Sequence, residues 1–451
     1  MYDSMTDTAQ VQDREVIAAH DKSAKLLLRL WARTRMDWGY VTDSLAGAFR
    51  KNRGLGSSDR RFISETLYGM VRHWRRLDEA LALGGVRFTN RAPDAERLVA
   101  YLMLEEGLSV DGASSLSPGV DWEVVSSINE KIETESNQKV RLARLYSFPD
   151  WLTAMMVKQY ENAAGPLLES LNKRAPLTIR ANVLARERDA VAETLEKEGM
   201  SIEVGSHGPW SLHVSSRGNV FSSPSFKNGL FEVQDEGSQL IAELVAPPPG
   251  GLIVDYCAGA GGKTLAIAAL LKNKGRIVAC DVDAKKLTEL RRRSTRAGVT
   301  NTRAVLLERE EENLAVLAEW QGKASRVLVD SPCTGVGAIR RNPEARWRLA
   351  KEDISRMATL QFSILDQAST LVAPGGRLVY ATCSLLKEEN QDIVEKFLKT
   401  HSEYAVMTVK EIWGAKRSTG VSSDGRFLEL SPSVQGTDGF FAAVLRRSPQ
   451  G

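Results

Sequence analysis

The spacing of apolar positions divides the 451-residue chain into three segments. In the first, residues 1–148, apolar residues recur at helical spacing, and the clearest helix is expected to begin at the N-cap candidates Ser57-Ser58-Asp59. Its apolar stripe consists of Ile63, Leu67, Met70, Val71 and Trp74. The stretch from Gly112 to Asn137 is rich in Ser, Gly and Glu and is expected to be a loop. The pattern predicts an all-helical domain.

The second segment, residues 149–230, mixes two kinds of periodicity. A helix is expected after Pro149-Asp150, and the alternating stretch Leu177–Asn182 predicts a strand. A helix over Glu187–Glu198 and short strands near Ile202–Val204 and Leu212–Val214 follow. We expect a small α+β module.

In the third segment, residues 231–451, strands and helices alternate. The expected strands are Leu252–Asp255, Arg276–Asp281, Arg326–Asp330 and Arg377–Thr382, and the expected helices are Lys263–Leu271, Ala284–Ala297 and Ile354–Val372. This alternation predicts an α/β domain with a doubly wound, Rossmann-like parallel sheet. Ligands of such sheets bind beyond the carboxyl ends of the strands, so the chemistry is expected there.

Composition narrows the class of protein. With 43% hydrophobic and 26% charged residues, the chain is typical of globular proteins and unlike collagen or disordered chains. It has no apolar run near the ~18–20 residues of a membrane helix, and its polar N-terminus, residues 1–16, is unlike a secretory signal. Four widely spaced cysteines predict neither a metal site nor a disulfide framework. We therefore expect a cytoplasmic protein without membrane or metal partners, and a monomer.

The net charge of +3 says little about binding partners, but the charges are distributed unevenly along the chain. Residues 21–76 contain 13 Lys and Arg against 5 Asp and Glu. Such a stretch suits a polyanion, and it equally suits ordinary solvated helix faces.

A loop of small residues, Cys257–Thr264, joins the first expected strand of the third segment to the next helix. A phosphate-binding P-loop would need glycine where Cys257 stands, so that pattern fails, and a dinucleotide fingerprint does not fit cleanly. Asp281 ends the second strand, where a carboxylate can accept hydrogen bonds from ribose hydroxyls or cap a helix. Loop and acid together indicate an adenosine-containing cofactor, either a nicotinamide dinucleotide or S-adenosylmethionine.

Two of the four cysteines follow expected strands at this same edge. Cys333 lies three residues after Asp330, and Cys383 follows the next strand. Two sulfurs and a carboxyl group suit methylation of C5 of a pyrimidine: a thiolate adds at C6, a carboxyl group stabilises charge at N3, and a base removes the C5 proton. Cys280 is expected in the core, and Cys257 is expected in the loop wall.

Several motifs resemble those of the Sun (Fmu) family of RNA cytosine-5 methyltransferases. The signature motifs are Asp255–Thr264, Asp330–Cys333 and Tyr380–Ser384, and the flanking elements are Gln234–Ser238, Gly337–Glu344 and Gly436–Phe441. The start of the chain around Leu55–Arg61 resembles the NusB-like domain fused to the family's bacterial 16S ribosomal RNA member. The resemblance implies an RNA-binding NusB-like domain over residues 1–148, an RNA-binding module over 149–230 and the methyltransferase domain over 231–451.

The resemblance also implies residue roles. Cys383 would be the nucleophile, Cys333 would assist product release, Asp330 would contact the cytosine ring, and Lys263 would reach into the site. S-adenosylmethionine would be bound by Cys257, Ala258, Gly259, Ala260, Gly261, Gly262, Lys263, Asp281, Glu308 and Asp330. The implied substrate is RNA, with 16S rRNA expected and transfer RNA left open.

Two departures from the family pattern leave alternatives open. The family usually has Ala-Pro where Gly259-Ala260 stands, which suggests a more flexible loop and weaker cofactor binding. Glu308 is the nearest match to an aspartate after the third strand, so its contact with the adenine side is in question. The alternatives are a ribosome-assembly RNA-binding factor with a weakened cofactor site, and a DNA cytosine-5 methyltransferase that uses Cys333 as its nucleophile.

Two groups of arginines are expected to differ in whether they contact RNA. Arg340, Arg341, Arg346 and Arg348 are expected to contact RNA phosphates, with Trp347 stacking on a base. Arg291, Arg292, Arg293 and Arg296 are expected to form a solvated helix face.

Overall fold

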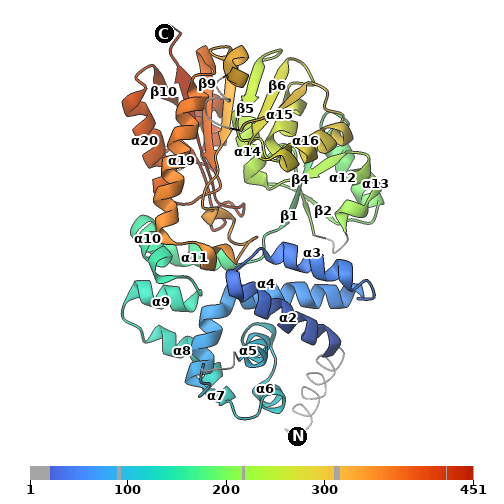
Figure 1. Ribbon diagram of the computed structural model, residues 1–451, viewed down its shortest axis with the longest axis vertical. Helices are drawn as coiled ribbons and strands as arrows, with labels where there is room; N and C mark the ends of the chain where they lie inside the picture. Colours follow the sequence, from blue (N-terminus) through green and yellow to red (C-terminus); the bar gives the residue numbers. More distant parts are fainter. Residues whose placement is uncertain (1–20, 89–92, 216–218, 309–314, 423, 450–451) are drawn as a thin grey trace. The chain divides into compact units, whose positions relative to one another are not determined.

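The computed structural model of the chain describes residues 21–88, 93–215, 219–308, 315–422 and 424–449 (Figure 1). The polar N-terminal stretch 1–16 lies outside these residues. The chain forms two compact units. The helical unit contains residues 1–173 and 339–351, and the sheet unit contains residues 174–338 and 352–451.

The helical unit is built from short and medium helices around one long helix. They are α2 (Asp21–Asp37), α3 (Val41–Lys51), α4 (Ser57–Leu83), α5 (Asp94–Glu106), α6 (Val110–Leu116), α7 (Trp122–Ser126), α8 (Ile128–Glu133), α9 (Gln138–Leu145), α10 (Asp150–Tyr160), α11 (Ala164–Asn172) and α18 (Ala345–Arg348). The predicted stripe of α4 is buried from Ile63 to Val71, while Trp74 is half-buried. The N-cap prediction was wrong by one residue: Gly56 occupies that position and Ser57 is already helical.

The stretch Gly112–Asn137 is not a loop, as its composition had suggested, but contains most of α6 and all of α7 and α8. Four of its large apolar residues are buried: Trp122, Val125, Ile128 and Ile132. Two of its polar neighbours cap helices, since Ser109 accepts a hydrogen bond from Gly112 N–H and Asp121 accepts one from Val124 N–H. The polar residues that suggested a loop therefore include residues that cap the start of short helices.

Residues 339–351 belong to the core of the helical unit. The Arg346 side chain is fully buried, 3.8 Å above the Phe148 ring, and it donates to the carbonyl of Ser147 and to Asn172 Oδ1. The Trp347 indole donates to the Val71 carbonyl, within an aromatic cluster that includes Trp38 and Trp74. The expected phosphate contact of Arg346 was therefore wrong, because sequence alone does not distinguish a buried arginine from a solvated one. Arg340 is also buried, Arg341 is half-buried and Arg348 is exposed.

The sheet unit contains two sheets. The smaller has four antiparallel strands in the order β2-β3-β1-β4, namely β1 (Leu177–Ala181), β2 (Ile202–Val204), β3 (Ser211–Val214) and β4 (Phe231–Val233). The same part of the chain contains the helices α12 (Arg188–Lys197) and α13 (Pro224–Lys227). Its core includes Ile179, Val191, Leu212 and Phe231, which matches the α+β pattern expected for this region.

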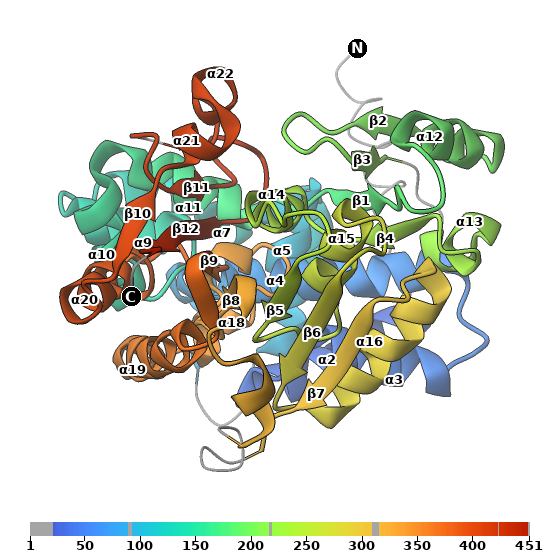
Figure 2. The same cartoon turned by 90° about the horizontal axis from the view of Figure 1, so that it is seen from above.

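The larger sheet has the order β10-β12-β9-β8-β5-β6-β7, with β11 paired to β12. Figure 2 shows these strands from above. They are β5 (Leu252–Asp255), β6 (Arg276–Asp281), β7 (Thr302–Leu306), β8 (Ala324–Asp330), β9 (Val372–Thr382), β10 (Tyr404–Met407), β11 (Leu428–Leu430) and β12 (Phe440–Arg447). The five strands from β9 to β7 are parallel, and β10, β11 and β12 pair antiparallel.

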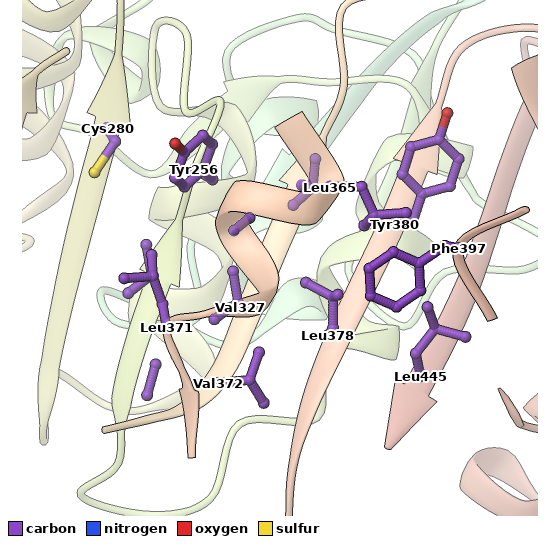
Figure 3. Packing of buried hydrophobic residues seen from close by; sticks show 14 of the residues in the cluster. Tyr256, Cys280, Val327, Leu365, Leu371, Val372, Leu378, Tyr380, Phe397 and Leu445 are labelled. Atoms are coloured by element: carbon purple, nitrogen blue, oxygen red, sulfur yellow. The ribbon is translucent and has the colours of Figure 1, made fainter. Parts of the chain in front are cut away.

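Helices cover both faces of this sheet because its strand residues alternate between two cores. Val327 of β8 lies in one core with α19 (Lys351–Ser369) and α20 (Gln391–Thr400), while Leu328 lies in the other with α14 (Glu236–Leu244) and α15 (Gly262–Leu270). Figure 3 shows the first core, which includes Leu365 of α19 and Leu378 of β9. Cys280 is fully buried in it, as predicted. The predicted doubly wound fold is confirmed.

The chain order reverses beside β5. From β5 the chain runs to β6 and β7 on one side, and then continues with β8 and β9 on the other. The loops after β5 and β8 therefore diverge, and the region beyond the carboxyl ends of these strands, here called the crevice, is where such folds bind ligands. Among the described residues, no helix has the length and apolarity needed to span a bilayer.

Candidate active site at the carboxyl ends of β5, β8 and β9

The loop between β5 and α15 is held by backbone hydrogen bonds. Gly259 N–H donates to Asp281 Oδ2 at 2.8 Å, Ala258 N–H donates to the Cys280 carbonyl, and Gly261 N–H donates to the Ala258 carbonyl. Gly259 and Gly261 have φ values of 55° and 87°, which glycine adopts without strain. Apart from Gly259 itself and its two chain neighbours, no described atom lies within 4 Å of where a Gly259 Cβ would stand. This space borders the crevice and permits close approach of a ligand.

Asp281 fits the role of a ribose acceptor. It is buried at the end of β6, and its two oxygens each accept one backbone N–H, from Gly259 and Asp283. A carboxylate offers about four acceptor positions, so further hydrogen bonds from vicinal hydroxyls can be accommodated. The loop and this carboxylate together suit an adenosine cofactor.

Arg293 and Arg296 contradict the expected solvated helix face on α16 (Ala284–Ala297). Both pair with the buried Glu232, at 2.9 and 2.5 Å. Arg293 also donates to the Ala260 carbonyl, so it supports the cofactor loop. The sequence placed these arginines on a helix, but it did not reveal that β4 supplies a buried carboxylate to two of them.

Lys263 and Asp330 form an ion pair in the crevice. Lys263 is the second residue of α15 and Asp330 ends β8, and their Nζ and Oδ2 atoms lie 2.6 Å apart. The Asp330 side chain is 31% exposed, whereas that of Lys263 is only 9% exposed. Lys263 therefore orients a carboxylate that remains accessible from the crevice.

The structure brings Cys333 and Cys383 together. Their strands β8 and β9 are parallel neighbours, with Asp330 opposite Ala381, and the two Sγ atoms lie 3.2 Å apart. Both side chains are half-buried. Contact with the Cys383 thiol, followed by burial, raises the pKa of Cys333 well above its ordinary value. Cys333 thus keeps its proton and can donate it in a hydrogen bond to the Cys383 sulfur.

The turn that carries Cys383 is in close contact with two glycines. Gly337 N–H donates to the Cys383 carbonyl at 3.0 Å, and Gly439 N–H donates to the Gly337 carbonyl at 2.8 Å. A Cβ on Gly337 would lie 2.2 Å from the Gly439 oxygen. These positions require glycine because three backbone segments meet there, which explains part of the motifs Gly337–Glu344 and Gly436–Phe441.

The other residues considered in the sequence analysis, Cys257, Cys280 and Glu308, show no sign of catalytic activation. Burial raises the pKa of Cys257 and of Cys280, the latter to about 12, so neither thiol is activated. Glu308 is exposed just beyond β7. Among the described residues, no group of His, Cys, Asp and Glu side chains is arranged to hold a metal.

Asp255, at the end of β5, gives a stability prediction. Burial raises its pKa to about 7, against the effect of the hydrogen bond from Thr264. A carboxyl group whose pKa is raised by folding stabilises the protein at low pH and loses this contribution as the pH rises toward 7. We expect the free energy of unfolding of the wild type to fall by up to about 4 kcal/mol between pH 4 and pH 8 from this group.

The variant Asp255→Asn cannot ionise and should lack this loss. Urea denaturation of both proteins at several pH values measures it, and the advantage of the variant should grow with pH. Parallel curves would contradict the raised pKa.

The comparisons with known proteins identify the family of the chain. Residues 242–446 match the family described as 16S rRNA methyltransferase RsmB/F, and residues 148–221 match the ferredoxin-like domain of RsmF/B-like methyltransferases. A Synechocystis sp. protein named probable ribosomal RNA small subunit methyltransferase B is 30% identical over 417 residues, covering 87% of this chain and 92% of the relative. A Photorhabdus laumondii relative, named ribosomal RNA small subunit methyltransferase B, is 30% identical and covers 78% and 79%.

Solved structures agree with this. The crystal structure of PH0851 is similar with a TM-score of 0.76 at 27% identity, covering 94% of this chain and 98% of that one. A methyltransferase homolog from Pyrococcus horikoshii has a TM-score of 0.59 at 25% identity, covering 69% and 100%.

These matches decide between the two cofactors that the loop left open. S-adenosylmethionine, not a nicotinamide dinucleotide, is the cofactor. The assignment of the glycine loop and Asp281 to its binding stays a prediction. The predicted Sun (Fmu) resemblance is confirmed: the chain belongs to the RsmB/F family of 16S rRNA methyltransferases.

Proposed function

We propose that the protein methylates C5 of a cytosine in RNA, with small-subunit ribosomal RNA as the substrate, through a covalent bond between Cys383 and cytosine C6. The observation that carries the proposal is the pair of sulfurs 3.2 Å apart beside the Lys263–Asp330 ion pair. The relatives named ribosomal RNA small subunit methyltransferase B support the substrate class.

The cytosine ring has to be made nucleophilic before it can accept a methyl group. Addition of the Cys383 thiolate to C6 converts the ring into an enamine whose C5 carries electron density. Addition at C6 pushes an electron pair onto N3, which takes up a proton from solvent. The Asp330 carboxylate, held in place by Lys263, would accept a hydrogen bond from the resulting N3–H. S-adenosylmethionine supplies the electrophilic methyl group when bound.

Product release requires the C5 proton and the Cys383 sulfur to leave. The proton passes to a base, and the electrons of the C5–H bond form the C5–C6 double bond as the S–C6 bond breaks. The departing sulfur becomes a thiolate, and the Cys333 thiol beside it can donate a hydrogen bond to it. Cys333 would thus assist release, while Cys383 is the nucleophile.

The helical unit offers a surface for the phosphate backbone. Eight exposed cationic side chains lie on α2, on α3 and around the start of α4: Lys22, Lys25, Arg29, Arg33, Arg50, Lys51, Arg53 and Arg61. They agree with the excess of positive charge over residues 21–76. We propose that this surface, rather than the buried Arg346, contacts RNA phosphates.

RNA affinity should therefore fall steeply as salt rises. Replacing Arg33 or Arg53 by glutamine should reduce the slope of log affinity against log salt by about 0.7–1 each, because one phosphate contact is lost. Arg292→Gln, on the exposed side of α16, is the matched control and should leave the slope unchanged. Filter binding at several salt concentrations measures this, and a flat dependence would contradict phosphate contact.

The function itself is tested with purified protein, S-adenosylmethionine and RNA of the small ribosomal subunit. Mass spectrometry of the digested nucleosides should show 5-methylcytidine that depends on both protein and cofactor. A methyl group on another atom would refute the C5 assignment. RNA binding without any methyl transfer would instead favour an RNA-binding assembly factor.

A further inference from the structure

A buried carboxylate, Glu389, lies beneath the two cysteine turns. It ends the short helix η5 (Lys387–Glu389) and has no exposed surface. Its Oε1 accepts hydrogen bonds from Thr334 N–H at 2.8 Å and from Gln361 Nε2 at 3.0 Å. Its Oε2 accepts from the hydroxyls of Thr334 and Ser384, both at 2.5 Å. Four donors thus converge on one carboxylate.

Two of these partners directly follow the cysteines in the chain. Thr334 comes after Cys333, and Ser384 comes after Cys383. Because both bond to the same carboxylate, the loop after β8 and the turn after β9 are linked through one side chain. Gln361 of α19 extends the link, since its Nε2 also donates to the Pro332 carbonyl, on the other side of Cys333.

The next residue secures the Cys383 turn from its second side. Asn390 Oδ1 accepts from the Thr382 hydroxyl at 2.5 Å, and its Nδ2 donates to the Ser384 carbonyl at 2.9 Å. The Glu389 carbonyl in turn accepts from the Tyr380 hydroxyl of β9 at 2.6 Å. The segment that carries the carboxylate is therefore fixed to the strand that leads to Cys383.

We propose that Glu389 is a positioning residue that sets the separation of the Cys333 and Cys383 sulfurs by bonding to the residue after each. The proposal rests on the proposed roles of the two cysteines. A buried carboxylate is costly unless all its acceptor positions are used, and here two of its three partners adjoin the reacting thiols. The span of the side chain, rather than its charge alone, determines how far apart the turns lie.

Two variants distinguish span from charge. Glu389→Gln keeps the length of the side chain and one acceptor oxygen, whereas Glu389→Asp keeps the charge but is one methylene too short to reach both turns. We expect the aspartate variant to lose more activity, with kcat lowered by about 100-fold and KM for RNA nearly unchanged, because misplacement by about 1 Å is that costly. The glutamine variant should retain an intermediate kcat.

The sulfur separation is tested directly with dibromobimane, which becomes a fluorescent cross-link only when two nearby thiols each displace one of its bromides. With the full-length protein and neither RNA nor cofactor, peptide mapping should find Cys333 joined to Cys383 in the wild type. The cross-link should be partly lost in Glu389→Gln and mostly lost in Glu389→Asp. Glu243→Gln is the matched control, a largely buried carboxylate paired with Arg417, and should cross-link as the wild type does.

The proposal would be overturned if both Glu389 variants cross-linked as the wild type does. It would also be overturned if Glu389→Asp retained more cross-link and a higher kcat than Glu389→Gln. If the Glu389 variants fail to fold in thermal melts, Ser384→Ala removes a single link and should also lose cross-linking, while retention would count against the proposal. Failure of the proposed function is recognised separately, as absence of any RNA adduct at Cys383 in a wild type that still cross-links.

Discussion

Replacement of Cys383 by alanine is expected to abolish covalent capture of RNA and to lower methyl transfer by at least about 10³-fold, because no other group then adds to C6. RNA containing 5-fluorocytosine provides the measurement. Fluorine cannot leave C5 as a proton does, so the wild type should remain bonded to the RNA after methyl transfer. The Cys383→Ala variant should show no such band on a denaturing gel.

Cys280→Ala is the control that shows whether removing a thiol elsewhere in the protein affects adduct formation. The Cys280 side chain is fully buried in the sheet core, so this variant should still form the adduct. An adduct that survives in Cys383→Ala but disappears in Cys333→Ala would assign the nucleophile to Cys333, as in DNA cytosine-5 methyltransferases.

Replacement of Cys333 by alanine is expected to have the opposite effect on the adduct. Addition at C6 remains possible, but the departing Cys383 sulfur loses its hydrogen-bond donor at 3.2 Å. Turnover should fall by about 10²-fold or more while the covalent complex with ordinary RNA accumulates, because a proton donor to a leaving group contributes on this order. A time course on denaturing gels measures the accumulation.

Cys333→Ser is the matched variant for this experiment. A serine hydroxyl still donates a hydrogen bond, so the complex should accumulate less than in Cys333→Ala. Equal and rapid turnover without any accumulated complex in both variants would show that Cys333 has no part in release.

Much of the fold could be read from periodicity. The alternation of strands and helices after residue 250 predicted the parallel sheet, and the carboxyl ends of β5, β6, β8 and β9 were placed correctly. The start of β9 was predicted too late, because Val372 was assigned to the preceding helix. Such patterns are reliable because a buried parallel strand needs an apolar run and the following helix needs an apolar stripe. The stretch Gly112–Asn137 was not predicted as helical because its helices are only five to seven residues long, and two of them begin at polar capping residues.

Charged residues were the least predictable. Arg346 and Arg293 looked in sequence like surface cations, yet Arg346 lies above Phe148 and Arg293 pairs with Glu232. Whether an arginine faces water or a buried acceptor depends on which distant segment packs against it. The residues around an arginine in the sequence do not indicate which distant segment this is.

The sequence by itself determined where the candidate reactive groups gather. Cys333, Cys383 and the glycine loop follow strands, Asp330 ends one, and parallel strands bring their carboxyl ends to one edge of the sheet. Only the tertiary structure decided how these groups are held. The 3.2 Å between the sulfurs, the lysine beside Asp330 and the shared contacts of Glu389 join residues that are 50 or more positions apart along the chain in most cases. Packing fixes such distances, because each depends on the register of neighbouring strands and on the helix that covers them.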